Sequence, residues 1–224
     1  MASPSIVDYT RPLIWQVGYL GQDYWSWVHK PLPKWSGRHL LLLSKYRLIE
    51  SFTFMPWYGP LLCWLPVVHC LGIYAPTDFG IVPWHWLGGL LAWPLLMEYG
   101  LHRFIFHRQT SGWLGNTLHF CMHGIHHKDP YDELRLVAPL TLSVPIYWLF
   151  YILLTNMPFI HANAVVAGLI CGYLVYDELH YWQHHGNLWM LRKLKRHHMA
   201  HHFVQPDRKF GVSTDLTDRL YGSQ

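Results

Sequence analysis

Four long stretches of this 224-residue chain contain no Asp, Glu, Lys or Arg. They cover residues 54–74, 81–97, 136–156 and 158–176, and each is near the roughly 20 residues that a helix needs to cross a bilayer core. Only 13% of the residues are charged, against about 25% in a typical soluble domain. These stretches predict four transmembrane helices. The alternative is a soluble protein with buried helices, but four such runs exceed what a core of this size could bury.

The basic residues decide the predicted topology. The connections at 75–80 and 156–157 are too short to carry domains, so the four segments form two hairpins. All 17 Lys and Arg residues then lie on one side: six precede residue 54, four lie between 100 and 135, and seven follow 177. The positive-inside rule assigns that side to the cytosol. We expect one all-helical membrane domain over 54–224, preceded by a cytosolic or interfacial segment over 1–53.

Ten of the 18 histidines fall into four short groups, each at the end of an apolar run. The groups are His102 and His107; His123, His126 and His127; His180 and His184; and His198, His201 and His202. Three groups have i, i+3 or i+4 spacing, which places their imidazoles on one helix face. His102 and His107 are five residues apart, about 140° around an ideal helix. They can share a site only if the helix loosens or ends between them.

The number of histidines predicts two metal ions. Imidazole is a common ligand for zinc, iron, copper and nickel, and ten rings exceed what one ion can bind. All four groups lie on the basic side, so we expect the site in a helical cap at the cytosolic ends of the membrane helices. Carboxylate-rich di-iron sites use Glu side chains, whereas neutral imidazoles leave a strong positive field suited to an oxygen-derived anion.

Two carboxylates are spaced to orient these rings. Glu98 stands four residues before His102 and Asp177 three before His180, so each is expected to accept a hydrogen bond from that ring; a helix-end charge is the alternative. His119 is expected to support a ligand rather than to bind a metal. The other seven histidines are not expected to be ligands: His29, His39, His69, His85, His161, His185 and His197.

Seven stretches of the chain carry motifs of one known family. They are VDYTRPLIWQVGYLGQDYWSWVHKP (7–31), EYGLHRFIFH (98–107), LHFCMHGIHHKDP (118–130), RLVAP (135–139), YDELHYWQHHG (176–186), LKRHHMAHHF (194–203) and FGVST (210–214). Together they resemble fatty acid 2-hydroxylases from about residue 7 to the C-terminus. The histidine pattern alone would specify only the wider superfamily of membrane hydroxylases and desaturases. The N-terminal block and the HGIHHKDP sequence narrow the resemblance from this superfamily to the fatty acid 2-hydroxylases.

This resemblance implies an integral monooxygenase of the endoplasmic reticulum, with four transmembrane helices and a cytosolic cap. Such an enzyme uses molecular oxygen to place a hydroxyl at carbon 2 of long acyl chains of ceramides and other sphingolipids. By analogy with related desaturases, it also implies two ligand sets: His102, His107, His123, His127 and His201 for one metal, and His126, His180, His184, His198 and His202 for the other. Family members have been described with zinc, but zinc has no redox chemistry. Iron is therefore the chemically reasonable working metal, and the identity stays open.

The resemblance also implies an electron donor. Many family members carry a fused cytochrome b5 domain with an HPGG haem motif, and no HPGG occurs in this sequence. Electrons from NADPH are therefore expected to arrive through a reductase and a separate cytochrome b5, unless the sequence is part of a longer chain. The fatty acyl or ceramide substrate is expected between the helices, lined by Trp93, Tyr147 and Trp148. Plain helix packing is the more common role of such residues and is the favoured interpretation for these three.

Two other functions are kept as alternatives. A sterol oxidase or desaturase of the same superfamily would share the histidine groups but not the N-terminal block. A metal transporter usually has its ligands at mid-membrane, whereas these histidines follow the apolar runs. The sequence has no basic run with interleaved aromatic residues that would indicate nucleic acid binding. Membrane lipid is the expected surrounding because of the four uncharged runs.

Overall fold

The structure, a computed structural model, describes residues 7–33, 39–74 and 80–224. All regular structure in these residues is helical, with no strand. The α-helices are α1 (Tyr24–Val28), α2 (Arg47–Ser51), α3 (Gly59–Ile73), α4 (Val82–Ala92), α5 (Gly112–His119), α6 (Ile125–Lys128), α7 (Leu140–Thr155), α8 (Ala162–His185), α9 (Arg192–Phe203) and α10 (Leu216–Leu220). Short 3-10 helices cover Leu13–Trp15, Val17–Asp23 and Trp189–Leu191, and π-helices cover Trp93–Glu98, Leu101–Phe106 and Phe120–Gly124.

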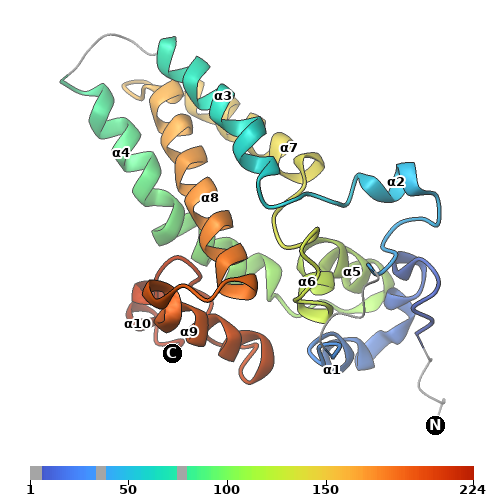
Figure 1. Ribbon diagram of the computed structural model, residues 1–224. Coiled ribbons are helices and arrows are strands. Elements are labelled where there is room, and N and C mark those ends of the chain that lie inside the picture. Colours follow the sequence, from blue (N-terminus) through green and yellow to red (C-terminus); the bar gives the residue numbers. More distant parts are fainter. Residues whose placement is uncertain (1–6, 34–38, 75–79) are drawn as a thin grey trace.

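Helices α3, α4, α7 and α8 form a bundle at one end of the molecule (Figure 1). Helix α8 lies at its centre and packs against the other three. Aromatic side chains fill much of the space between them, because their flat rings bury a large apolar area. The buried residues of this core are Trp64, Trp93, Tyr147, Val166, Leu169, Ile170, Tyr173 and Leu174.

Helices α4 and α8 approach each other so closely that only glycine fits at the crossing. A Cβ atom on Gly89 would lie 2.2 Å from the carbonyl oxygen of Val165, and one on Gly168 would lie 2.0 Å from that of Trp86. Small residues allow this backbone-to-backbone approach in membrane helices. The crossing fixes α8 relative to the helical segment that continues from α4, and both carry histidines of the groups described above.

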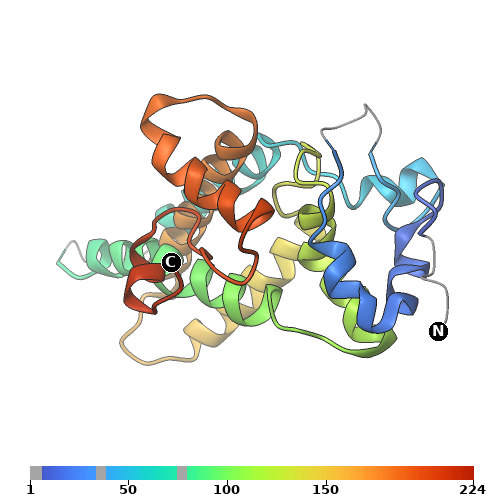
Figure 2. The same ribbon diagram turned by 90° about the horizontal axis from the view of Figure 1, so that it is seen from below.

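The remaining described residues form a cap below the bundle (Figures 1 and 2). Its N-terminal segment packs on α6 and on the residues that follow α5. A buried ion pair reinforces the cap, because the Arg135 guanidinium contacts the carboxylates of both Glu50 and Asp132. The buried residues of the cap core are Leu13, Val17, Leu20, Tyr24, Val28, Leu40, Leu42, Phe120 and Ile125.

A helix overlaps each predicted membrane segment, but the bounds differ. The first and third begin later than predicted, at Gly59 and Leu140, because Pro60 occupies the first turn of α3 and Pro139 is the extended N-cap of α7. The fourth begins at Ala162 and continues to His185. Among the described helices, α8 alone is both long enough and apolar enough to cross a membrane, judged by helix length, mean hydropathy and number of charged residues. The connection at 75–79 lies outside the described residues.

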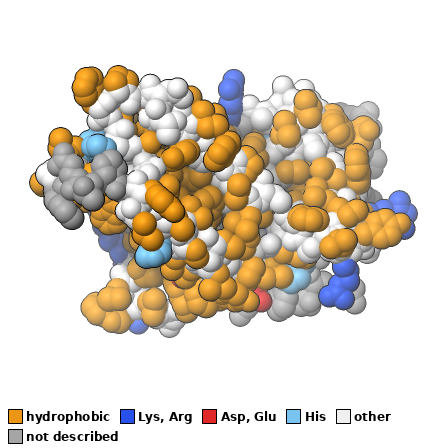
Figure 3. Space-filling model, turned by 90° about the horizontal axis from the view of Figure 1, so that it is seen from above, with side chains coloured by type: hydrophobic (Ala, Val, Ile, Leu, Met, Phe, Trp, Pro, Cys, Tyr) orange, Lys and Arg blue, Asp and Glu red, His pale blue; other side chains and the backbone are white. Residues whose placement is uncertain are grey.

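Large apolar side chains cover the outward faces of the bundle. Figure 3 shows hydrophobic side chains over much of the surface seen from the bundle end. Exposed examples are Leu62 and Leu65 on α3, Trp84 and Leu91 on α4, and Trp148, Leu149 and Ile152 on α7. Soluble monomers rarely expose contiguous apolar patches larger than a few hundred Å². This surface therefore indicates an apolar neighbour, either lipid or protein.

The α4–α8 crossing can be tested with a matched pair of substitutions. Gly89→Val should destabilise the protein by roughly 1–3 kcal/mol, the usual cost of overpacking, because its Cβ meets the Val165 carbonyl. Gly88→Val is the control, since a Cβ there meets nothing within 4 Å. Thermal unfolding in detergent should separate the two variants. Equal melting temperatures would contradict the close crossing.

Candidate metal centre

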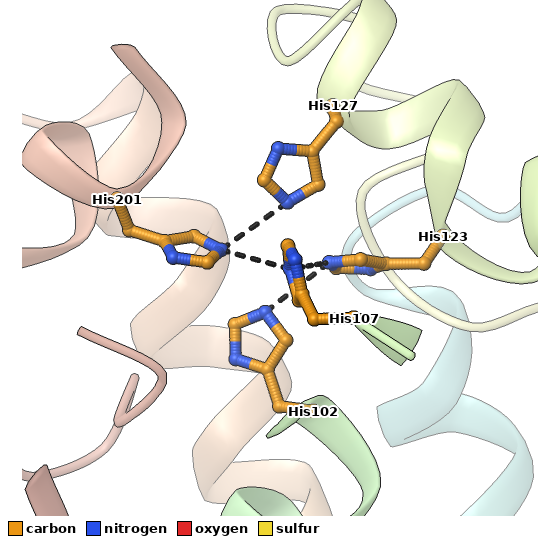
Figure 4. Close-up of side chains that lie close together, drawn as sticks. All are labelled: His102, His107, His123, His127 and His201. Carbon is orange, nitrogen blue, oxygen red and sulfur yellow. Dashed lines mark hydrogen bonds between the residues drawn. The ribbon is translucent and has the colours of Figure 1, made fainter. Parts of the chain in front are cut away.

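Five histidines converge in a first histidine group where the bundle meets the cap. Each ring contributes one nitrogen, and these five nitrogens lie within 4.8 Å of one another. The members are His102, His107, His123, His127 and His201 (Figure 4). The five-residue spacing of His102 and His107 is accommodated by the π-helix Leu101–Phe106. The His107 N–H donates to the carbonyl of His102 at 3.0 Å, an i to i+5 bond. The helix has therefore loosened as the spacing required, and that prediction is confirmed.

The other five histidines form a second histidine group beside the first. Its members are His126, His180, His184, His198 and His202, and their nitrogens also lie within 4.8 Å of one another. Helix α8 supplies His180 and His184 from one face, while α6 and α9 supply the rest. Each histidine that the sequence marked as a ligand thus lies in one of two groups, and these groups match the two sets that the resemblance implied. Their role as metal ligands stays a prediction.

Adjacent histidines are divided between the groups. His126 belongs to the second group and His127 to the first, and His202 and His201 are divided in the same way. Consecutive residues on an α-helix point about 100° apart, so a helix between two sites can serve both. This is why the groups share α6 and α9.

The spacing of the nitrogens fits a shared cation. Neighbouring Nε2 atoms are 3.1–3.2 Å apart in the first group and 2.9–3.1 Å apart in the second. Two imidazole nitrogens bound to one ion at about 2.1 Å, at right angles, would be about 3.0 Å apart. Each group therefore has the radius of a coordination sphere.

The protonation states also fit a cation. The Nδ1–H of His102 donates to the carbonyl of Phe210 at 2.5 Å, and that of His201 donates to the carbonyl of Arg208 at 2.6 Å. A neutral imidazole has only one N–H, so the Nε2 atoms of both rings present lone pairs to the group. In the second group, both ring nitrogens of His180 are buried without a hydrogen-bond partner among the described residues. The Nε2 lone pairs of His102 and His201, and the unpartnered nitrogens of His180, are therefore open to a cation.

Burial keeps the rings neutral and therefore able to bind metal. It lowers the pKa of His102 to about 4 and that of His126 to about 3. The pKa values of His127, His201 and His202 also lie well below the usual range, through burial and then through repulsion by neighbouring rings. Protons do not compete for these lone pairs at neutral pH, because the pKa values of the rings lie far below the ordinary value of about 6.5.

Neither of the two carboxylates predicted to orient the rings bonds to its ring, so that prediction is wrong. Glu98 accepts hydrogen bonds from the backbone N–H groups of Val212 and Ser213, at 2.6 and 2.9 Å, and from the Ser213 hydroxyl. Asp177 is buried, and its Oδ2 has no hydrogen-bond partner among the described residues. Helical spacing predicts only which face of its helix Glu98 occupies. The hydrogen-bond partners of Glu98 come from the C-terminal part of the chain, which the spacing does not predict.

Of the histidines set aside, His29 lies against the first group. Its ring stacks on that of His107, with centroids 5.8 Å apart, and meets His127 edge-on at 5.0 Å. No sequence spacing points to this contact, because the N-terminal segment reaches the site only through the folded cap. His119 bonds to the Tyr24 hydroxyl at 2.5 Å, and His197 bonds to Asp218 at 2.8 Å. Both lie outside the two groups.

A cavity of about 420 Å³ reaches both groups. His102 and His123 of the first group and His126 and His180 of the second line it. The rest of its lining is mostly apolar and comes from both the bundle and the cap, including Leu42, Phe52, Trp93, Phe106, Met122, Leu136, Leu142, Ile146, Tyr147 and Tyr173. Trp93 and Tyr147 line this cavity and also belong to the buried core of the bundle, so each meets both roles that the sequence left open. Trp148 does not, because it lies on the outer face of α7 with 63% of its surface exposed.

The model of the fatty acid hydroxylase family matches residues 86–223, which include all ten grouped histidines. The chain belongs to the fatty acid hydroxylase family. A dihydroceramide fatty acyl 2-hydroxylase of Arabidopsis thaliana is 38% identical over an alignment of 229 residues including gaps. The alignment covers 97% of this chain and 92% of that protein. A fatty acid 2-hydroxylase of Rattus norvegicus is 35% identical; the match covers 96% of this chain but 64% of that longer protein.

A solved structure also resembles this member of the family. It is described as full-length scs7p with only the hydroxylase domain visible, and it is 32% identical with a TM-score of 0.87. The match covers 99% of this chain and 86% of that chain. The all-helical fold is therefore that of a hydroxylase domain, as the sequence motifs indicated.

Proposed function

We propose that this protein is a fatty acid 2-hydroxylase that acts on long acyl chains of ceramides or their precursors. The observation that carries the proposal is the mostly apolar cavity, whose wall includes histidines of both groups. An acyl chain in this cavity would bring a carbon beside the rings. The names of the relatives from Arabidopsis thaliana and Rattus norvegicus support the same reaction.

The two histidine groups would hold two metal ions, iron or zinc, with iron favoured because the reaction is an oxidation. With molecular oxygen and two electrons, the metals would supply oxidation of the C–H bond at carbon 2; one oxygen atom enters that bond, the other leaves as water, and two protons are taken up. The residues hold the donor nitrogens in place. His102 and His201 are fixed by their Nδ1 bonds to backbone carbonyls, and the apolar cavity wall keeps bulk water from the reacting carbon.

We also propose that the bundle crosses the endoplasmic reticulum membrane four times, with the cap on the cytosolic side. Three observations support this topology: the uncharged segments, the exposed apolar faces of α3, α4 and α7, and the basic residues on the cap side. Residues 54–224 would then be the membrane hydroxylase domain and residues 1–53 its cytosolic or interfacial segment. The substrate would reach the cavity from the same membrane.

Electrons from NADPH would come through a reductase and cytochrome b5. The basic stretch Arg192, Lys193, Lys195 and Arg196 of α9 is a candidate docking surface, because an acidic partner is attracted to it. Lys193 pairs with Asp215 at 2.6 Å, and Lys195 donates to the Gly186 carbonyl at 2.6 Å. Arg192 and Arg196 are exposed and one helical turn apart, which makes them the better contacts. The alternative partner of this surface is anionic phospholipid.

The first prediction from this proposal concerns metal content. Purified protein should contain two metal ions per chain by elemental analysis, since each group has five donors. His126→Ala should lose metal, because this ring belongs to the second group. His185→Ala is the control, because His185 lies outside both groups. One ion or fewer per chain at full occupancy would contradict the paired site.

The second prediction concerns electron supply. Reversing charge at Arg192 and Arg196 to Glu should slow turnover with cytochrome b5 in a salt-dependent way, because attraction between exposed charges is screened by salt. Metal content should not change. The matched control is Lys45→Glu with Arg47→Glu, at and beside α2 rather than on α9. Unchanged turnover in the α9 variant, or turnover that falls only together with metal content, would refute the docking surface.

The third prediction concerns the product. Expression in cells that lack their own enzyme should raise 2-hydroxylated ceramides, with the hydroxyl on the acyl chain rather than on the sphingoid base. His201→Ala should abolish the product, because it removes a donor from the first group, whereas His185→Ala should retain it. Lipid mass spectrometry locates the new oxygen. Oxidised sterols or new double bonds in place of 2-hydroxy acyl chains would assign the protein to another branch of the superfamily.

A further inference from the structure

Among the hydrogen bonds of the described residues, the C-terminal segment bonds to two rings of the first histidine group and to no ring of the second. We name residues 207–224 the C-terminal strap. Its carbonyl groups at Arg208 and Phe210 accept the Nδ1–H bonds of His201 and His102. In the second group, by contrast, every Nδ1 atom is buried without a hydrogen-bond partner among the described residues; the rings are His126, His180, His184, His198 and His202. The two groups therefore have similar donors but differently supported rings.

Asp218 is the residue that holds the strap in this position. Its side chain is completely buried, and it accepts hydrogen bonds from the N–H groups of Phe210 and Gly211 at 2.9 and 2.8 Å. It also accepts from the Ser223 hydroxyl at 2.7 Å and contacts His197 on α9 at 2.8 Å. A buried carboxylate with several charge-assisted hydrogen bonds is a strong and directional anchor.

One peptide unit connects Asp218 to the first group. The Phe210 carbonyl and the Gly211 N–H belong to the same rigid plane. The N–H end of this plane donates to Asp218 and the carbonyl end accepts from His102. The turn is tight, since a Cβ atom on Gly211 would lie 2.1 Å from the carbonyl oxygen of Thr214. The position of Asp218 therefore sets where the His102 ring finds its acceptor.

From this geometry we propose that Asp218 is a positioning residue for the first metal site, acting through the Phe210–Gly211 peptide and His102. This inference rests on the proposed metal centre. An acceptor on Nδ1–H fixes the ring and makes its other nitrogen a better donor, and loss of such partners typically lowers metal affinity by about 10–100-fold. Because the strap bonds directly to rings of the first group alone, loss of Asp218 should weaken that metal site and leave the other unchanged.

The experiment measures release of two cobalt ions to an excess of chelator, followed by the visible spectrum of the bound metal. Wild-type protein should release the two ions in two phases. The His180→Ala variant damages only the second histidine group, so the phase that remains in this variant belongs to the first histidine group. Asp218→Asn keeps the side-chain size but removes the anionic acceptor. It should weaken binding about 10–100-fold in the first-group phase only, with a changed cobalt spectrum. Asp218→Glu should restore part of the loss.

Asp215→Asn is the matched control, because this strap carboxylate contacts only Lys193 and Arg219 in the ion pairs that the structure describes. If Asp218→Asn does not fold, Ser223→Ala removes one hydrogen bond to Asp218, together with the bond between the Ser223 and Tyr99 hydroxyls, and should shift the same phase by a smaller factor. Unchanged release in folded Asp218→Asn, or equal loss from both sites, would overturn the positioning role. Failure of the wild-type protein to bind two ions would instead overturn the proposed metal centre.

Discussion

The gathering of ten neutral imidazoles, nine of them buried, at one junction is the constraint on which the rest of the structure depends. A buried polar atom without a partner costs roughly 1–3 kcal/mol, and lone pairs that face one another cannot satisfy each other. Either a proton or a metal cation must lie between them. Burial holds the pKa of His102 near 4 and that of His126 near 3, so neither ring takes up a second proton at neutral pH and each keeps one lone pair for a metal. The glycine crossing, the π-helices and the strap hold the elements that carry these rings.

Much of this arrangement could be predicted from local sequence. The spacing of His180 and His184 placed both on one face of a helix, and α8 carries them in that way. The five-residue spacing of His102 and His107 required a loosened helix, and the observed i to i+5 bond meets that requirement. The all-helical fold followed from the uncharged runs. These features depend on residues within one or two turns, where helical geometry leaves few alternatives.

The rest depends on contacts between distant residues. Glu98 was predicted to face His102, yet it binds Val212, which is 114 positions later. His29 was set aside because nothing near it in the sequence points to metal chemistry, yet its ring packs on His107. Spacing also could not divide His126 from His127, because the division depends on where α8 and α9 stand around α6. Only the resemblance to a known family provided that division before the structure did.

The lining of the cavity bears on which carbon of an acyl chain the proposed reaction would reach. It is mostly apolar on both sides, with Ile146 from the bundle and Phe52 from the cap, and the polar side chain of Arg135 lines it from the cap. A chain with its tail between the bundle helices and its polar head toward the cap would have its first carbons at the junction, where the histidines lie. Carbon 2 is the first carbon beyond the carbonyl that carries hydrogen. In that orientation, the proposed hydroxylation would reach carbon 2 for any chain length that the cavity admits.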